Sequence, residues 1–228
     1  DQTVSIQRAI DQLYLNASNK GTSQARVELI LEPGEYNISS TIYLPPYATI
    51  RGAGSNKTII NAGNHVAFQT VNETSTPGVY ASDAVSTTLN QARQINMSGL
   101  TINGAHTGIV LQSCKDSVFK DLIISGSWSL TDSVVINSIG IKLNSLSTDV
   151  TSQNNIFENV YIKNKSTAVV SDWDIRENVW TNCRFEILNK GIVFGENTIL
   201  GTSGQLTGPT KNKVTHSVFD DIEFEAIQ

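Results

Sequence analysis

A nine-residue phrase recurs along the chain and constrains its fold more than any other feature. Its nine positions are, in order, two polar residues, Val or Ile, an aromatic residue, any residue, and Asn or Asp. An apolar residue, any residue and a second apolar residue complete it. Copies occur at 116–124, 154–162, 177–185 and 216–224, and a weaker one ends at Ile102. The apolar residue after Asn or Asp recurs with spacings of 22, 38, 23 and 39 residues, at Leu100, Leu122, Val160, Cys183 and Ile222. A base period near 22 is typical of one solenoid turn, and the longer spacings indicate turns that carry loops.

A second short apolar segment follows most copies, as expected for a second buried strand in each turn. These segments are 108–111, 140–143, 167–170 and 191–194, and the loops are expected at 125–139, 145–153 and 196–213. A leucine-rich repeat would need Leu-x-x-Leu-x-Leu and regular helices, and a β-sandwich would show hairpin turns instead of a recurring phrase. The pattern therefore predicts an all-β fold, a single-stranded parallel β-helix.

Stacked parallel strands place equivalent residues about 4.8 Å apart, so inward columns must be apolar. The expected core columns are Leu100, Leu122, Val160, Cys183, Ile222 and Ile102, Ile124, Ile162, Phe185, Phe224. Asn and Asp tolerate the left-handed backbone conformation, which predicts a polar turn ladder. Its expected members are Gly99, Asp121, Asn159, Asn182 and Asp221.

The N-terminal residues 5–14 place apolar side chains on one face at helical spacing, which predicts an α-helix that caps the open stack. These side chains are Ile6, Ala9, Ile10, Leu13 and Tyr14. The chain is therefore divided into a capping helix and lead-in at 1–24 and a parallel β-helix with long loop insertions at 25–228.

Three motifs near the N-terminus carry a family resemblance. They are an Ile-Gln-Arg-Ala-Ile helix from Ile6, a Leu-Glu-Pro-Gly-Glu-Tyr strand from Leu31, and a Thr-Ile-Arg-Gly-Ala-Gly turn from Thr49. With them the chain resembles the pectate-lyase-like superfamily, which implies a right-handed parallel β-helix. Because the sequence stops at Gln228 directly after a copy of the phrase, the β-helix is expected to continue beyond it in the native protein.

Composition excludes several function classes. The formal net charge is −5 and the 16 Lys and Arg are scattered, which argues against a nucleic-acid partner. The sequence contains no apolar run long enough for a membrane span. Only Cys114 and Cys183 occur, without metal-ligand spacing, so two free thiols and no bound metal are expected.

Outward positions between the core columns hold the charged side chains. One outward column contains Tyr161, Arg184 and Glu223, and the next contains Lys163, Glu186 and Glu225. In this alignment Glu186 and Glu225 lie roughly 5 Å apart, a separation that a retaining glycosidase needs between its two carboxylates. The alternative interpretation is a salt-bridged outer surface without catalysis.

A second candidate is the Asp172-Trp173-Asp174 segment, where a strand leaves the stack. Its two carboxylates could act catalytically, as an alternative to Glu186, Glu223 and Glu225, or could bind Ca²⁺; the other interpretation is a solvated turn. No cofactor is otherwise expected. Aromatic and cationic side chains are the candidates for carbohydrate binding. They are Tyr161, Arg184, Trp128 and Trp173.

Within the superfamily, the chain is similar to β-helix modules of bacteriophage tail fibres and tailspikes. The resemblance implies a structural protein of the virion or the extracellular space, with a homotrimer or other virion proteins as partners and a host-surface polysaccharide as ligand. The superfamily's clustered catalytic carboxylates have no residue-by-residue match here, so an enzyme is the second choice. That alternative is a polysaccharide lyase or glycoside hydrolase, and a further one is a segment of a bacterial surface adhesin.

Overall fold

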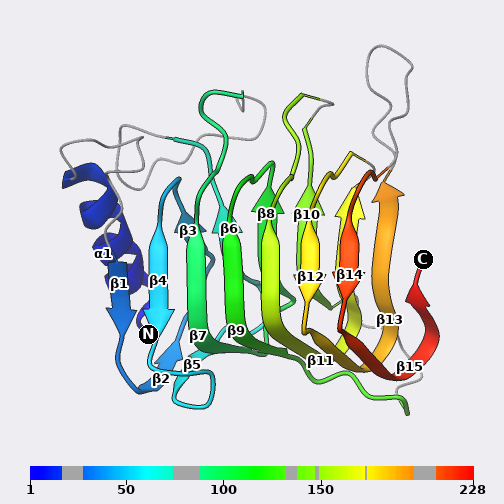
Figure 1. The fold of residues 1–228 in the computed structure, drawn as a ribbon. Coiled ribbons are helices and arrows are strands. Elements are labelled where there is room, and N and C mark those ends of the chain that lie inside the picture. Colours follow the sequence, from blue (N-terminus) through cyan, green and yellow to red (C-terminus); the bar gives the residue numbers. More distant parts are fainter. Residues whose placement is uncertain (17–27, 74–87, 132–137, 147–148, 173, 198–208) are drawn as a thin grey trace.

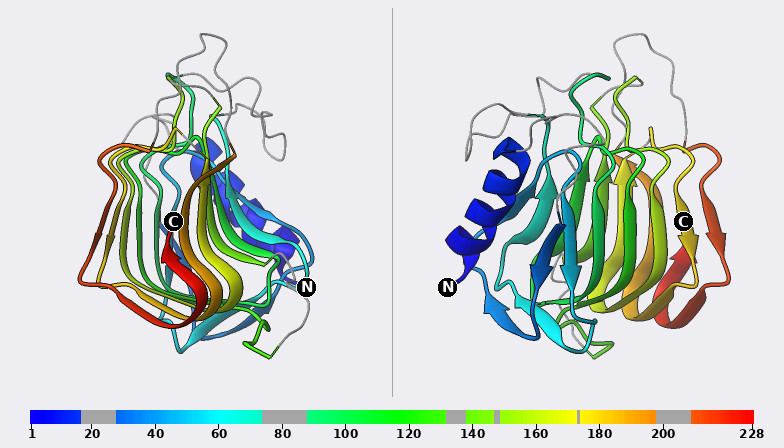
Figure 2. Two further views of the ribbon diagram at one scale, coloured as in Figure 1. Left: turned by 90° about the vertical axis from the view of Figure 1, so that its right-hand side faces the viewer. Right: turned by 60° about the vertical axis from the view of Figure 1, so that its left-hand side comes forward.

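The computed structural model describes residues 1–16, 28–73, 88–131, 138–146, 149–172, 174–197 and 209–228. Its strands wind around a common axis and every registered strand pair is parallel (Figure 1). Seen along the axis, each turn encloses one interior with three sides (Figure 2). The predicted all-β, right-handed single-stranded parallel β-helix with an N-terminal helix is confirmed.

The strands form three faces, and the long strands bend from one face to the next. The first face contains β1 (Glu28–Leu31), β4 (Thr49–Gly52), the starts of β7 (Asn96–Asn103), β9 (Val118–Ser125) and β11 (Ile156–Asp172), β12 (Val179–Thr181) and β14 (Lys213–Thr215). The second face contains β2 (Gly34–Asn37), β5 (Thr58–Asn61), the later parts of β7, β9 and β11, and the starts of β13 (Arg184–Asn197) and β15 (Val218–Ile227). The third face contains β3 (Ile42–Leu44), β6 (Val66–Thr70), β8 (Thr107–Gln112), β10 (Ile139–Asn144) and the ends of β11, β13 and β15.

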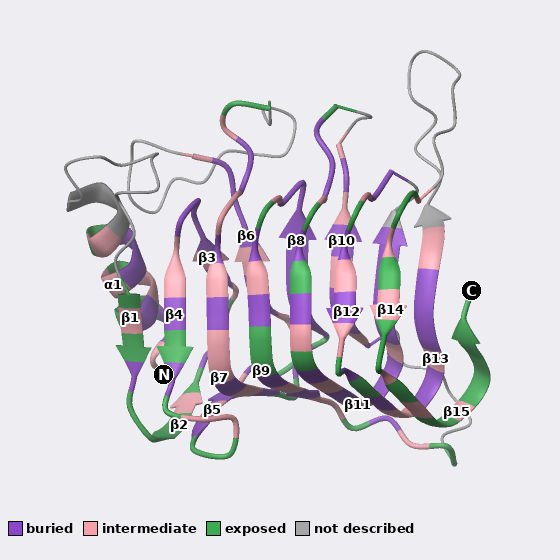
Figure 3. Cartoon of the chain, viewed as in Figure 1, coloured by how far each residue is buried: buried purple, intermediate pink, exposed green. Residues whose placement is uncertain are grey.

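Buried residues recur along the strands of successive turns (Figure 3). Their apolar side chains fill the interior in columns, as the repeat predicts. Leu100, Leu122, Val160 and Cys183 are buried in successive turns. An aromatic column runs beside them: the ring centroids of Phe119 and Phe157 are 5.4 Å apart. Those of Phe157 and Trp180 are 5.1 Å apart, and both pairs are stacked. The expected second apolar segments are confirmed as third-face strands, with Ile109, Ile141, Val169 and Ile192 in register.

A buried polar ladder lies at the corner between the third and first faces. The Asn155 side chain donates from Nδ2 to Asn178 Oδ1 at 2.9 Å, and Asn178 Nδ2 donates to Asn212 Oδ1 at 3.1 Å. Each amide also donates to a backbone carbonyl, for example that of Ser152 for Asn178. The ladder therefore satisfies backbone groups at a corner where the regular strand pairing is interrupted.

The last copy of the phrase is wrongly placed by the sequence alignment. Phe185 pairs with Phe219, and Cys183 N donates to Ser217 Oγ, 34 residues away, so the copy is 211–219 and not 216–224. Phe224, expected in the core, is 68% exposed, whereas Phe219 stacks on Phe185 at 4.8 Å. The misplacement arises because residues with a left-handed backbone recur five positions apart within each turn. Both His216 and Asp221 have positive φ, so either residue fits the Asn/Asp position of the phrase.

The helix α1 (Thr3–Asn16) covers the open first turn (Figure 2). Its Ile6 and Ile10 are buried in the core. The Gln7 side chain bonds the strand edge twice, because Nε2 donates to Tyr43 O at 3.1 Å and Oε1 accepts from Tyr43 N at 2.7 Å. The helix thereby satisfies backbone groups that an uncovered edge strand would leave open.

Replacement of Gln7 by alanine should lower the free energy of unfolding by roughly 1–2 kcal/mol, because two hydrogen bonds to the edge strand are lost. Urea denaturation of the purified chain measures the effect. Gln12→Ala is the control, since Gln12 is an exposed glutamine of the same helix. An equal loss in both variants would mean that Gln7 acts only through helix propensity.

The two thiols are free, as predicted, and both are buried. Burial raises the pKa of Cys114 to about 12 and that of Cys183 to about 11. Both thiols therefore stay protonated at neutral pH and act as small packing groups.

Candidate functional site

The second face carries a compact charged cluster, which we call the second-face cluster: Tyr161, Lys163, Arg184, Glu186 and Asp220. Register brings the five together, because Tyr161 lies opposite Arg184, and Lys163, Glu186 and Asp220 occupy one outward column across β11, β13 and β15. The predicted grouping of Tyr161, Arg184 and Glu186 is thus found in the structure.

Arg184 links the two carboxylates of this cluster. Its Nε lies 3.0 Å from Glu186 Oε2 and its Nη2 lies 3.4 Å from Asp220 Oδ2. The side chains of Arg184 and Asp220 are about half exposed, whereas that of Glu186 is 19% exposed. The guanidinium therefore offsets the repulsion between carboxylates on neighbouring strands.

Tyr161 is held from several sides. Its hydroxyl donates to Glu186 Oε2, and the Lys163 Nζ and Arg184 Cζ atoms lie 5.1 Å and 5.5 Å from its ring centroid. Burial, followed by the hydrogen bond to Glu186, raises the pKa of Tyr161 to about 12. The phenol therefore remains a hydrogen-bond donor at neutral pH, and its ring makes cation–π contacts.

The predicted carboxylate partners of Glu186 are wrong. Glu225 lies opposite Lys190, and Glu223 lies at a local register irregularity between the Leu188–Ile222 and Lys190–Glu225 pairs. Asp220 is the carboxylate beside Glu186, and sequence reasoning missed it because the last copy of the phrase was placed five residues too late. The signal for the correct register was Asn212, which repeats the buried Asn178 of the preceding turn.

The remaining predicted residues do not join this cluster. Trp128 is buried at another corner, where its backbone N–H donates to the backbone oxygen of Asn164 at 3.0 Å. Asp174 is buried and its backbone O accepts from Ser145 Oγ at 2.9 Å. Trp173 and the side chain of Asp172 lie outside the described residues. The described part of the chain contains no group of three or more His, Cys, Asp or Glu side chains that could hold a metal ion.

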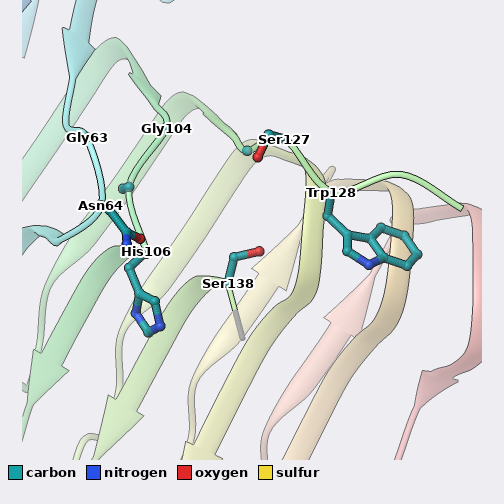
Figure 4. A pocket seen from close by; sticks show the side chains of 9 residues that line it. Gly63, Asn64, Gly104, His106, Ser127, Trp128 and Ser138 are labelled. Atoms are coloured by element: carbon teal, nitrogen blue, oxygen red, sulfur yellow. The ribbon is translucent and has the colours of Figure 1, made fainter. Parts of the chain in front are cut away.

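A second feature is a pocket of about 320 Å³ at the corner between the second and third faces (Figure 4), which we call the corner pocket. Its wall consists of backbone at stacked glycines and of small polar or aromatic side chains. The lining residues are Gly63, Asn64, Gly104, Ala105, His106, Gly126, Ser127, Trp128 and Ser138.

A buried lysine lies directly behind this pocket. Lys165 occupies a core position, opposite Leu188, and is fully buried. Its Nζ donates to the carbonyl oxygens of Gly104, at 2.7 Å, and Ala105. The side chain passes Gly126, where a Cβ would lie 2.9 Å from Lys165 Cδ. The ammonium thus satisfies two carbonyls at the corner between β7 and β8.

Burial lowers the pKa of Lys165 to about 8 from its ordinary value of 10.5. Because the unfolded chain holds this proton up to a higher pH than the folded chain does, folding should become more favourable as pH rises from about 8 to 10.5. Between pH 7 and 10 the free energy of unfolding of the wild type should rise by roughly 2–3 kcal/mol relative to that of Lys165→Met. Denaturant titrations at both pH values measure this difference. A Lys142→Met variant, altered on the third face, should follow the wild type; a constant difference between wild type and Lys165→Met would contradict the assignment.

The sequence comparison assigns the family. The sequence model described as Rhamnogalacturonase A/epimerase, pectate lyase-like, matches residues 1–193 of the 228-residue chain. The chain belongs to this pectate lyase-like family. No curated protein sequence matches it closely enough to count as a relative.

Solved structures similar to this pectate lyase-like chain come from several sources. One is ORF18 of Geobacillus virus E2, with 14% identity and a TM-score of 0.49; the match covers all of this chain and 56% of that one. The mannuronan C-5 epimerase AlgE4 A-module of Azotobacter vinelandii has 10% identity and a TM-score of 0.29, with 100% and 93% covered. The surface adhesin PfbA of Streptococcus pneumoniae has 10% identity and a TM-score of 0.33, with 100% and 90% covered. The chain thus spans little more than half the length of the phage protein.

The second-face cluster of this pectate lyase-like chain offers hydrogen-bond donors and acceptors side by side. Lys163, Arg184 and the Tyr161 hydroxyl are donors, and Glu186 and Asp220 are acceptors. Such a surface presents hydrogen-bonding partners that are complementary to hydroxyl and carboxylate groups. None of the helical residues that the structure describes forms a segment long and apolar enough to cross a membrane.

Proposed function

We propose that this chain is a rigid β-helix module of a virion appendage or another extracellular protein, and that its second-face cluster binds a surface polysaccharide. The module would act as a scaffold whose repeated turns hold the binding residues in fixed register. A bacteriophage tail fibre or tailspike is the proposed setting, with a homotrimer or other virion proteins as partners.

The observation that carries the proposal is that Arg184 joins Glu186 of its own strand to Asp220 of the next turn, on a solvent-facing side where Tyr161 of the preceding turn lies opposite it. Strands in register hold these groups about 4.8 Å apart, so a chain of sugar residues can contact several of them at once. Multiple polar contacts of this kind are typical of wet, specific recognition surfaces.

The same contacts favour binding over glycosidic cleavage. A retaining glycosidase needs one carboxylate free to attack and one protonated to act as an acid. Here Arg184 contacts both Glu186 and Asp220, and Tyr161 also donates to Glu186. Donors of the chain itself therefore already engage both carboxylates, which leaves neither of them free to attack a sugar.

A polysaccharide-modifying enzyme is the second candidate, favoured by the family description, which contains rhamnogalacturonase and epimerase. In that case Glu186 and Asp220 would be the acid–base pair. Release of reducing ends or of unsaturated products absorbing near 235 nm, abolished by Glu186→Gln, would support it.

The test of the proposal is binding of immobilised bacterial and algal polysaccharides by the wild type and by Arg184→Ala. We expect at least one polysaccharide to bind saturably without product release, and Arg184→Ala to weaken binding by about tenfold or more, since hydrogen bonds to charged groups contribute roughly 1.5–3 kcal/mol.

Arg51→Ala is the matched control. Arg51 also projects from a strand and pairs with a carboxylate, Glu28 at 2.8 Å, but it lies on the first face. Equal loss in both variants would point to a general charge effect and would contradict a site at the second-face cluster. Binding unaffected by Arg184→Ala would contradict it as well.

A further inference from the structure

The outward column that contains Lys163 of the second-face cluster continues towards the N-terminal turns without charge. Ser125 lies opposite Lys163. Asn103 and Asn61 follow it on the next two strands. The side chains are linked, because Ser125 Oγ donates to Asn103 Oδ1 at 3.0 Å and Asn103 Nδ2 donates to Asn61 Oδ1 at 3.2 Å. A polar strip therefore extends from the cluster along the ends of β9, β7 and β5.

The corner pocket begins where this strip ends. Gly104 follows Asn103 directly in the chain. Gly126 follows Ser125 in the same way, and both glycines line the pocket. Ser125 is one strand away from Lys163, and neighbouring strands are about 4.8 Å apart. A polysaccharide main chain that contacts the second-face cluster and follows the strip would therefore pass beside the pocket.

The wall of the pocket is polar, open to solvent and without acidic side chains. Asn64, His106 and Ser127 are exposed residues of this wall, and Figure 4 shows them around the pocket. None of the nine described lining residues is Asp, Glu, Lys or Arg. An amide, an imidazole and a hydroxyl group supply both donors and acceptors of hydrogen bonds. The wall therefore suits the hydroxyl groups of an uncharged ligand and offers no acidic group, Lys or Arg to pair with a charged one.

The pocket has room for one small ring and not for a main chain. Its volume of about 320 Å³ falls at the lower end of the range of roughly 300–1,000 Å³ found for small-molecule pockets. Part of the wall is bare backbone, at Gly63, Gly104 and Gly126. A single sugar that projects sideways from a main chain on the second face has the size and the chemistry that this pocket fits.

We propose that the corner pocket is a side pocket of the second-face site and holds one uncharged sugar that branches from the main chain of the bound polysaccharide. The ligand class is thus a branched polysaccharide whose side residue carries hydroxyl groups and no carboxylate. Asn64, His106 and Ser127 would contact those hydroxyl groups. The inference rests on the proposed function for the main chain, whereas binding of a free sugar in the pocket is measurable without it.

Free monosaccharides test the pocket itself. The ¹⁵N-labelled chain is titrated with D-glucose, D-galactose, D-mannose and L-rhamnose, and with D-glucuronate as the charged control. We expect at least one neutral sugar to move the backbone amide signals of residues 104–106 and 126–128 saturably, and glucuronate to move them less. No saturable movement with any neutral sugar at tens of millimolar, or a larger movement with glucuronate, would overturn the proposal.

Two variants test whether the pocket takes a branch. Ser127→Trp fills the pocket from an exposed lining residue, and Ser98→Trp adds the same ring at an outward position of the first face as the control. The probe is the polysaccharide of the binding panel that the wild type retains, before and after its branches are removed by periodate oxidation and mild acid. Ser127→Trp should weaken binding of the branched form by about tenfold or more and leave the debranched form unchanged. Ser98→Trp should change neither.

The outcomes separate this inference from the proposed function. Undiminished binding of the branched form by Ser127→Trp, or an equal loss for both forms, would overturn the side pocket, while Arg184→Ala still tests the second-face cluster. If Ser127→Trp does not fold, equal affinity of the wild type for the two forms overturns the side pocket. If the wild type binds no polysaccharide of the panel, the proposed function fails and the branch assignment fails with it.

Discussion

Replacement of Asn178 by leucine should lower the free energy of unfolding by roughly 3–5 kcal/mol, because it leaves several buried polar groups without partners. Asn178 Oδ1 accepts from the backbone N and the side-chain Nδ2 of Asn155, and its own Nδ2 donates to Ser152 O and Asn212 Oδ1. Asn155 and Asn178 are fully buried, so water cannot replace these bonds. Leucine has the same number and branching of side-chain heavy atoms as asparagine but has no hydrogen-bonding group.

Guanidinium denaturation monitored by circular dichroism measures this change. Asn103→Leu is the control, since Asn103 Nδ2 donates to Asn61 Oδ1 at 3.2 Å in an exposed ladder. Asn103→Leu should lower the free energy of unfolding by less than about 1 kcal/mol, because water can replace the hydrogen bonds of the exposed Asn103 side chain. A loss in Asn178→Leu no larger than in the control would show that the buried ladder contributes nothing to stability.

Phe157→Ala should lower the free energy of unfolding by roughly 3–5 kcal/mol through the cavity it creates. The ring is fully buried and stacks on Phe119 on one side and on Trp180 on the other. Removing it therefore breaks two aromatic contacts in the centre of the column, and neighbouring turns cannot close the gap because strand hydrogen bonding fixes their spacing.

Phe224→Ala makes the same chemical change at a residue that is 68% exposed. It should change the free energy of unfolding by no more than about 0.5 kcal/mol. The comparison, made by denaturation of both variants, also tests the corrected last turn. If Phe224→Ala were as destabilising as Phe157→Ala, Phe224 would occupy the core column that the sequence alignment assigned to it.

The sequence was sufficient to predict the fold because the period of the phrase is visible in residues that must be buried. Leu100, Leu122 and Val160 mark successive turns, and the structure aligns them in register. The prediction failed in the last turn, where left-handed residues five apart, His216 and Asp221, make two alignments nearly equivalent.

The candidate site was predictable only where the register was secure. Tyr161, Arg184 and Glu186 were grouped correctly because their turns follow one another without a long insertion. Asp220 was missed through the shifted last copy. Lys165 was not anticipated, since a lysine in a core column becomes understandable only when its hydrogen bonds to the carbonyls of Gly104 and Ala105, two turns away, are seen.

The buried ladder was also hidden in the sequence. The second polar residue of each phrase, such as Ser117, Asn155 or Asn178, looks like part of a solvated turn, and only the corner geometry shows that it points inward. Polar residues that recur in a fixed position of a solenoid can therefore be structural as readily as functional.

The most direct test of the proposed function is a crystal structure of the chain with an oligosaccharide prepared from the polysaccharide that it binds. We expect an intact oligosaccharide lying across β11, β13 and β15, within hydrogen-bond distance of Arg184 and of Glu186 or Asp220. An oligosaccharide bound on the first or third face, with the second-face cluster untouched, would contradict it.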